Sequence, residues 1–202
     1  MKYKAVLFDL DGTLLDTLHD IADSMNAVLE KNGFATHPAE RYKKFIGGGV
    51  GDLARRALPE GVDNACATAI SSQMREEYAR RWGVTTRLYP GIADMLDGLV
   101  VRNLGISILS NKPDYFTRVM CEHFFGTWPF RMIMGASDNF PKKPDPSAAL
   151  YIARQMEIDP AEFLYLGDSD VDMKTAVAAG MFPAGALWGF RDAEELLAHG
   201  AK

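Results

Sequence analysis

The sequence has little of several features that point to particular classes of protein. Its 202 residues include only two cysteines, Cys66 and Cys121, which lie far apart and lack the spacing of metal-binding pairs. The net charge is -5, and no block of basic residues offers a surface for nucleic acid. No apolar stretch is long enough to span a membrane, and the start, Met1 to Lys4, lacks a signal peptide's apolar core. We therefore expect a cytoplasmic protein with reduced thiols that binds neither nucleic acid nor a membrane.

The residues that are present indicate an α/β protein. Hydrophobic residues make up 48 % of the chain and charged residues 24 %, and the length suits one large domain or a domain with an insertion. From about residue 90 onward, strand patterns alternate with helix patterns, which is typical of a parallel sheet covered by helices on both faces. The strands are expected near residues 6–8, 105–109, 132–134, 163–166 and 183–188.

The segment from residue 16 to residue 86 has a different pattern. It contains several amphipathic helix patterns and no strand candidate over some sixty residues. We therefore predict a small all-helical cap domain, residues 16–86, inserted after the first strand. The doubly wound, Rossmann-like core would be formed by residues 1–15 and 87–202.

Polar residues follow the predicted strands. An apolar run begins at Val6, is interrupted by Asp9 and is followed at once by Asp11 and Gly12. Aspartates in such a place are explained about equally well as turn formers or as ligands, because open α/β sheets bind ligands at the carboxyl ends of strands. Further polar groups stand at later strand ends or before a helix: Ser110, Asn111, Lys142, Lys143, Asp168 and Asp172. A parallel sheet brings such positions to one edge, so these side chains can converge.

Four of these segments resemble the motifs of the haloacid dehalogenase superfamily, and they occur in that family's order. They are Asp9 to Leu14, Ser110 with Asn111, Lys143 with Pro144, and Gly167 to Asp172. One such motif alone is a weak signal, whereas all four at predicted strand ends or helix starts are a strong one. Dehalogenases of the superfamily lack a second aspartate at the position of Asp11, so its presence favours phosphoryl transfer over attack on carbon.

The resemblance implies a role for each side chain. Asp9 would be the nucleophile that forms an aspartyl-phosphate. Asp11 would protonate the leaving alkoxide and later take a proton from the attacking water. Ser110 and Asn111 would bind the phosphoryl oxygens, and Lys143 would pair with both the nucleophile and the transferring phosphate. Lys142 is expected to be a solvated surface lysine.

The same resemblance implies Mg²⁺ as the cofactor. Its ligands would be the carboxylates of Asp9 and Asp168 and the main-chain carbonyl of Asp11, because Mg²⁺ prefers hard oxygen donors. Asp172 would be either a second carboxylate ligand or a residue that orients the others. Asp170 has no role in that pattern and is expected to serve a turn or a helix cap.

The cap segment resembles that of the phosphoglycolate phosphatase branch in its glycine cluster and the arginine that follows. Backbone amides near Gly48 and Gly49 can face an anion, and Arg56 could hold a substrate carboxylate through two hydrogen bonds. A flexible loop followed by a surface arginine explains the same residues equally well. The resemblance to this branch makes 2-phosphoglycolate the leading substrate, with Gly48, Gly49 and Arg56 as the candidate specificity residues.

Several alternatives remain open at this point. The substrate could be a sugar phosphate or pyrophosphate, and the same nucleophile could serve a phosphotransferase or a mutase. The mutase interpretation is weakened because Ile21 stands where the family's phosphoglucomutases carry a histidine. A non-catalytic phosphate binder on the same fold is the competing class. In every case the expected partner is a small phosphorylated metabolite, and the chain is expected to be a monomer or a homodimer.

Overall fold

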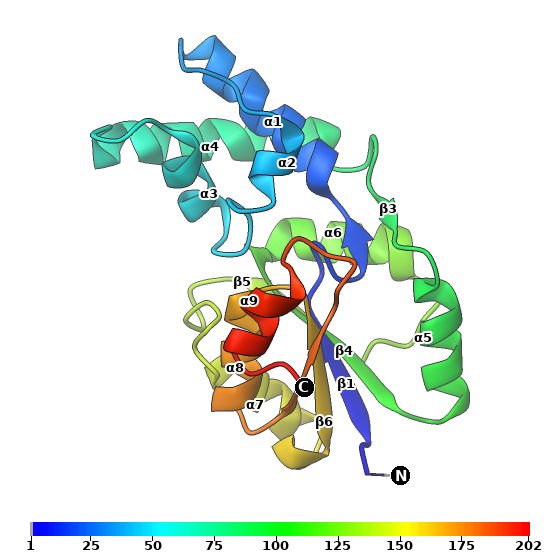
Figure 1. The fold of residues 1–202 in the computed structure, drawn as a ribbon. Helices are drawn as coiled ribbons and strands as arrows, with labels where there is room; N and C mark the ends of the chain where they lie inside the picture. The colour runs from blue at the N-terminus through cyan, green and yellow to red at the C-terminus, as the bar shows by residue number, and fades with distance from the viewer. Residues whose placement is uncertain (1) are drawn as a thin grey trace.

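The computed structural model describes residues 2–202, and its centre is a five-stranded parallel sheet in the order β5-β4-β1-β6-β7 (Figure 1). Strand β1 lies in the middle, hydrogen-bonded to β4 on one side and β6 on the other. The residues that follow β1 therefore sit at the centre of the sheet's carboxyl edge. The strands are β1 (Ala5–Phe8), β4 (Gly105–Pro113), β5 (Met132–Ala136), β6 (Phe163–Gly167) and β7 (Phe182–Gly185).

The two faces of the sheet support two hydrophobic cores, because alternate side chains of a strand point in opposite directions. In β1, Val6 and Phe8 enter the core that contains α5 and α6, whereas Ala5 and Leu7 enter the core that contains α7 and α8. The predicted doubly wound architecture is thus confirmed. The core helices are α5 (Ile92–Val101), α6 (Asp114–Phe125), α7 (Ser147–Gln155), α8 (Asp170–Ala178) and α9 (Ala193–Ala198), with a short 3₁₀ helix, η1 (Pro160–Glu162), before β6.

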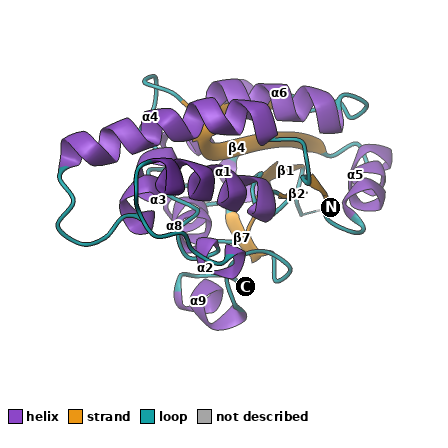
Figure 2. Ribbon diagram, turned by 90° about the horizontal axis from the view of Figure 1, so that it is seen from above, coloured by secondary structure: helices purple, strands orange, loops and turns teal. Residues whose placement is uncertain are grey.

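Four helices between β1 and α5 lie over the carboxyl edge of the sheet and form the cap (Figures 1 and 2). The chain enters and leaves it through two short antiparallel strands, β2 (Leu15–Asp16) and β3 (Arg87–Leu88). No helix of residues 2–202 is both long and apolar enough to cross a membrane. The cap helices are α1 (Leu18–Lys31), α2 (Ala39–Tyr42), α3 (Val50–Ala57) and α4 (Asn64–Arg81).

A buried carboxylate fixes the point where the chain returns from the cap to the core. Asp20, in the first turn of α1, is 2 % exposed and accepts hydrogen bonds from the backbone N–H and the hydroxyl of both Thr85 and Thr86 at 2.7–3.0 Å. Asp20→Ala would leave these donors buried without partners, so we expect a loss of about 2–4 kcal/mol in the free energy of unfolding. Urea unfolding measures this loss. The exposed Asp23→Ala is the matched control, and equal stability of the two variants would contradict the interpretation.

Candidate active site

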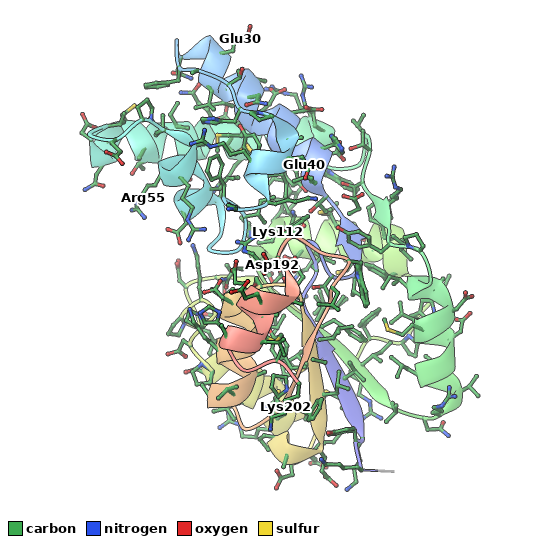
Figure 3. All side chains as sticks on the ribbon, viewed as in Figure 1. Glu30, Glu40, Arg55, Lys112, Asp192 and Lys202 are labelled. Carbon is green, nitrogen blue, oxygen red and sulfur yellow. The ribbon has the colours of Figure 1, made fainter. Side chains whose placement is uncertain are left out.

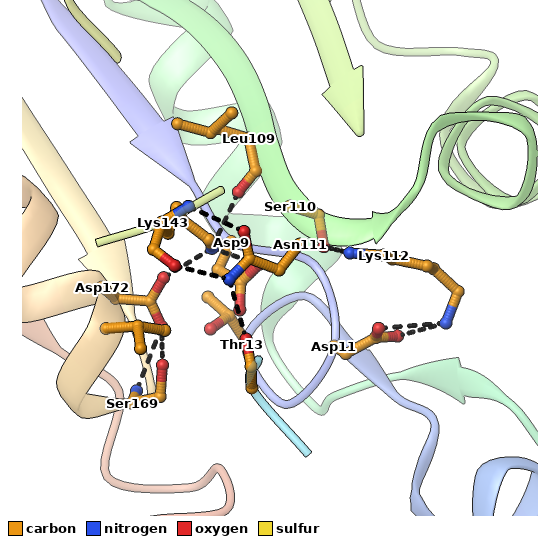
Figure 4. A network of polar contacts seen from close by, with 12 residues as sticks. Asp9, Asp11, Thr13, Leu109, Ser110, Asn111, Lys112, Lys143, Ser169 and Asp172 are labelled. Carbon is orange, nitrogen blue, oxygen red and sulfur yellow. Dashed lines mark hydrogen bonds and ion pairs between the residues drawn. The ribbon is translucent and has the colours of Figure 1, made fainter. Parts of the chain in front are cut away.

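A pocket lies where the cap meets the carboxyl edge of the sheet. The core contributes Asp9, Asp11, Ser110, Lys143 and Asp168 to its wall, so the side chains scattered through the sequence do converge. Figure 4 shows most of these groups from close by, and Figure 3 places Lys112 at the same level, between cap and core.

Asp9 directly follows β1, and its backbone N–H donates to the carbonyl of Leu166 on the neighbouring strand at 2.9 Å. Its side chain is buried, and Oδ1 accepts no hydrogen bond from the described residues. Lys143 Nζ lies 2.8 Å from this oxygen, so the contact is an ion pair without hydrogen-bond geometry. Burial and then the charge of Asp172 raise the pKa of the Asp9 carboxyl to about 7, although Lys143 opposes this shift.

Lys143 is held in the middle of the site by three oxygens. Its ammonium donates to the carbonyl of Leu109 at 3.0 Å and to Asp172 Oδ1 at 2.6 Å, in addition to its ion pair with Asp9. Burial alone would lower the pKa of this lysine, but the two carboxylates outweigh it and raise the pKa well above 10.5. Lys143 is therefore a fixed positive charge beside Asp9, as the sequence motif suggested.

Three buried carboxylates form a cluster at this point. Asp9, Asp168 and Asp172 each offer an oxygen, and these oxygens lie within 4.8 Å of one another. Asp168 Oδ1 accepts from the hydroxyl of Thr13 at 3.1 Å, and Oδ2 accepts from the Phe190 N–H at 2.7 Å. Burial, followed by the charges of Asp9 and Asp172, raises the pKa of Asp168 well above its usual range. Such a crowded set of hard oxygens can hold a metal ion, which would relieve the repulsion among them.

Asp172 differs from the other two because the protein already uses both of its oxygens. Oδ1 accepts from Lys143 and from the Tyr165 hydroxyl, and Oδ2 accepts from the backbone N–H and the hydroxyl of Ser169. The bond from the Ser169 N–H is one half of a capping box at the start of α8, in which the Ser169 side chain in turn accepts from the Asp172 N–H. Of the two roles that the sequence left open for Asp172, this arrangement favours orientation of Lys143 over direct contact with a metal.

Asp11 is paired with a lysine to which the sequence had assigned no role. Lys112 Nζ lies 2.9 and 3.0 Å from the two oxygens of Asp11 and 4.5 Å from the centre of the Tyr78 ring of the cap. Burial opposes charge on Lys112, but Asp11 reverses this effect and the pKa of the lysine is raised. The only signal in the sequence was its place beside Ser110 and Asn111, at the end of a predicted strand.

Ser110 and Asn111 both line the pocket, but their side chains are engaged differently. The Ser110 hydroxyl accepts the Lys112 N–H at 3.3 Å and donates to no acceptor among residues 2–202, so its O–H is available to a ligand. The side-chain amide of Asn111 donates to the carbonyls of Gly47 and Lys143 and accepts the Lys143 N–H. The amide therefore connects the cap loop to the Lys143 segment, and the expected contact between Asn111 and phosphate stays a prediction.

Of the three cap residues proposed for specificity, only one lies on the wall of the pocket. Gly49 lies on the pocket wall with φ of +86°, and a Cβ there would come within 2.9 Å of the Asn111 carbonyl oxygen. Gly48 lies outside the lining, and its carbonyl is 3.4 Å from Lys142 Nζ. Arg56 does not reach the site: its guanidinium donates to the Lys44 carbonyl at 2.9 Å and lines a separate depression. The expectation for Arg56 is corrected on this point.

Arg191 is a second site residue that the sequence did not reveal. It follows Phe190, whose N–H binds Asp168, and its guanidinium donates to the carbonyls of Lys43 and Ile46 in the cap. It also pairs with Glu195 at 3.0 Å. The loop after β7 therefore connects the acidic cluster to the cap. An arginine in a C-terminal loop carries no sequence signal for such a contact.

Comparisons with known proteins agree with this geometry. Residues 6–186 match the model of the haloacid dehalogenase-like hydrolase family. A phosphoglycolate phosphatase of Pseudomonas putida is 33 % identical over 193 residues, covering 93 % of this chain and 70 % of that protein. One from Nitrosospira multiformis is 31 % identical over 197 residues, covering 96 % and 87 %. A crystal structure from Lactobacillus delbrueckii subsp. bulgaricus, provisionally named a phosphoglycolate phosphatase, has a TM-score of 0.93 at 28 % identity, covering 100 % of this chain and 93 % of that one.

Proposed function

This chain belongs to the haloacid dehalogenase-like hydrolases and is a phosphatase of that family, and we propose that it is a Mg²⁺-dependent phosphomonoesterase acting through an aspartyl-phosphate. The observation that carries the proposal is the placement of Asp9. Its carboxylate is buried and lines the pocket, beside one fixed ammonium group and with oxygens of two further carboxylates within 4.8 Å.

The residues around Asp9 support a two-step displacement. In the first step the Asp9 carboxylate attacks phosphorus, the ester P–O bond breaks and Asp11, in its protonated form and released from its ion pair with Lys112, supplies the proton to the departing alkoxide. In the second step Asp11 takes a proton from a water that attacks the phosphorus and releases Asp9. Lys143 and the Ser110 hydroxyl hold phosphoryl oxygens during both steps. Asp9 and Asp168 would hold a Mg²⁺ ion, which would offset the charge of the phosphate as it approaches the carboxylates.

The proposed substrate is a small phosphorylated metabolite, and 2-phosphoglycolate is the leading candidate. The support comes from relatives of about 30 % identity that carry the name phosphoglycolate phosphatase. It also comes from the pocket, whose wall includes residues of the cap as well as of the core. A cytoplasmic location and a monomeric or homodimeric state stay predictions.

The test is phosphate release from a panel of esters with and without Mg²⁺. The panel contains 2-phosphoglycolate, a sugar phosphate, pyrophosphate and p-nitrophenyl phosphate. We expect metal-dependent release that is fastest on 2-phosphoglycolate, because substrate choice lies in the cap while the chemistry lies in the core. Preference for another ester would overturn the proposal of 2-phosphoglycolate as the substrate. Transfer of phosphate to an acceptor other than water would indicate a transferase. Binding of the esters without release of phosphate would indicate a phosphate-binding protein.

A further inference from the structure

The cap wall of the pocket is almost entirely apolar. Its side chains include Ile21, Ile46, Val50, Leu53 and Met74. Within the described chain, Arg75 of α4 is the one charged residue that the cap contributes to this wall. A single charge on an otherwise apolar surface is where a charged part of a substrate would be recognised.

The pocket has four cationic side chains, and three of them are already engaged. Lys112 pairs with Asp11, and Lys143 pairs with Asp9 and Asp172. Arg191 pairs with Glu195 and donates to two carbonyls of the cap. Arg75 is different: it has no ion-pair partner among residues 2–202, although Arg80 and Arg81 on the same helix both pair with Glu77. Among residues 2–202, it is the cation of this pocket that no carboxylate of the protein neutralises.

The position of Arg75 on α4 places it on the leaving-group side of the pocket. It lies three residues before Tyr78, about one turn of the helix away, and both line the pocket, with Tyr78 buried and Arg75 exposed to solvent. The ring of Tyr78 contacts Lys112, which holds Asp11, the residue proposed to protonate the leaving alkoxide. Asp9, Asp11 and Arg75 line the same pocket, so a substrate with its phosphorus at Asp9 and its alkoxide oxygen at Asp11 can present its leaving group to Arg75.

We propose that Arg75 is the specificity-determining residue that pairs with a carboxylate on the leaving group. The preferred substrates would then be phosphate monoesters of small hydroxy acids, which includes 2-phosphoglycolate. A guanidinium suits this task because it binds a carboxylate through two parallel hydrogen bonds. This assignment rests on the proposed phosphatase function and takes the place of the role that the sequence had suggested for Arg56.

The test compares two esters that differ in one group. They are 2-phosphoglycolate and 2-hydroxyethyl phosphate, in which a CH₂OH group replaces the carboxylate. We expect the wild type to prefer the charged ester, and Arg75→Gln to reduce the ratio of the two kcat/KM values roughly 10- to 100-fold, mainly through KM. Arg75→Lys should recover part of the ratio, because the charge remains while the paired geometry is lost. Arg56→Gln is the matched control and should leave the ratio within about 2-fold of wild type.

The outcomes separate this proposal from the function on which it rests. Asp9-dependent hydrolysis of both esters with an unchanged ratio in Arg75→Gln would overturn the role of Arg75 and leave the phosphatase intact. A wild type that does not distinguish the two esters would also overturn it. Absence of Asp9-dependent release from every ester of the panel would overturn the proposed function, and the assignment of Arg75 with it.

Discussion

Asp9→Asn is expected to lower kcat/KM for phosphate release by about 10³-fold or more and, in the absence of divalent cations, to raise the melting temperature. The amide of asparagine cannot form the aspartyl-phosphate, so the reaction loses its covalent route. The same change removes a charge that burial and Asp172 disfavour, as the raised pKa of about 7 indicates. A gain of about 1 kcal/mol would raise Tm by roughly 2–4 °C in a chain of this length. Loss of activity together with a gain in stability is typical of a residue retained for chemistry.

Release assays on the esters of the panel and thermal unfolding in metal-free buffer measure the two effects. Asp170→Asn is the matched control, because Asp170 lies two residues from Asp168 but points to the surface, where it pairs with Lys174 at 2.6 Å. It should retain activity within a few-fold of wild type. Turnover of Asp9→Asn within 10-fold of wild type would exclude Asp9 as the nucleophile, whatever its stability.

Much of the core could be predicted because burial leaves a strong pattern. The apolar runs that end in Asp9, Ser110 and Asp168 are strands buried on both faces, and their order specifies a parallel sheet. Boundaries were less predictable: β4 continues to Pro113 through an irregular register beyond Leu109, where polar residues interrupt the pattern. The two-residue strands β2 and β3 were missed, since so short a segment has no period to detect.

The site could be predicted where a side chain acts close to its own strand end, and not where it depends on packing between distant elements. Arg56 illustrates the second case. On α3, the pocket-lining residues Val50 and Leu53 lie near the start of the helix, and Arg56 lies nearly two turns beyond Val50, about 9 Å along the axis. Arg75 comes from another helix whose sequence carries no such motif. Its contribution emerges only when α4 packs against the core.

The charges of the acidic cluster require a counterion. Three carboxylates share one ammonium, that of Lys143, so two negative charges remain uncompensated in a buried place. The neighbouring pair of Asp11 and Lys112 is balanced on its own and offers no relief. Protonation of Asp9 or Asp168 is one way to lower this repulsion, as their raised pKa values show, and binding of a divalent cation is the other. A proton on Asp9 removes its nucleophilic form, whereas a bound cation lets both carboxylates stay ionised.

Removal of Mg²⁺ is therefore expected to lower the rate of phosphate release about 10³-fold or more and to lower the stability of the folded chain. A cation that binds the folded chain alone stabilises it by about 2.7 kcal/mol at a hundred times its Kd, which is roughly 5–10 °C in Tm. Asp168→Asn should weaken the binding of Mg²⁺ roughly 100-fold and reduce the rise in Tm that Mg²⁺ causes, because a neutral amide oxygen replaces a carboxylate. Calorimetric titration of the metal-free protein with Mg²⁺ measures the affinity without relying on turnover.

The Thr13→Val variant separates loss of a ligand from general damage to the cluster. Its hydroxyl donates to Asp168 without belonging to the carboxylate set, so we expect a weakening of Mg²⁺ binding of only about 10-fold. Full activity in the presence of a chelator, or equal Mg²⁺ affinity in the wild type and Asp168→Asn, would contradict a metal site here. In that case the buried carboxylates would have to be neutralised by protons, and Asp9 would be a poor nucleophile at neutral pH. Mg²⁺ binding and the nucleophilic role of Asp9 therefore depend on each other. The cation compensates the negative charges of the cluster, which would otherwise favour protonation of Asp9.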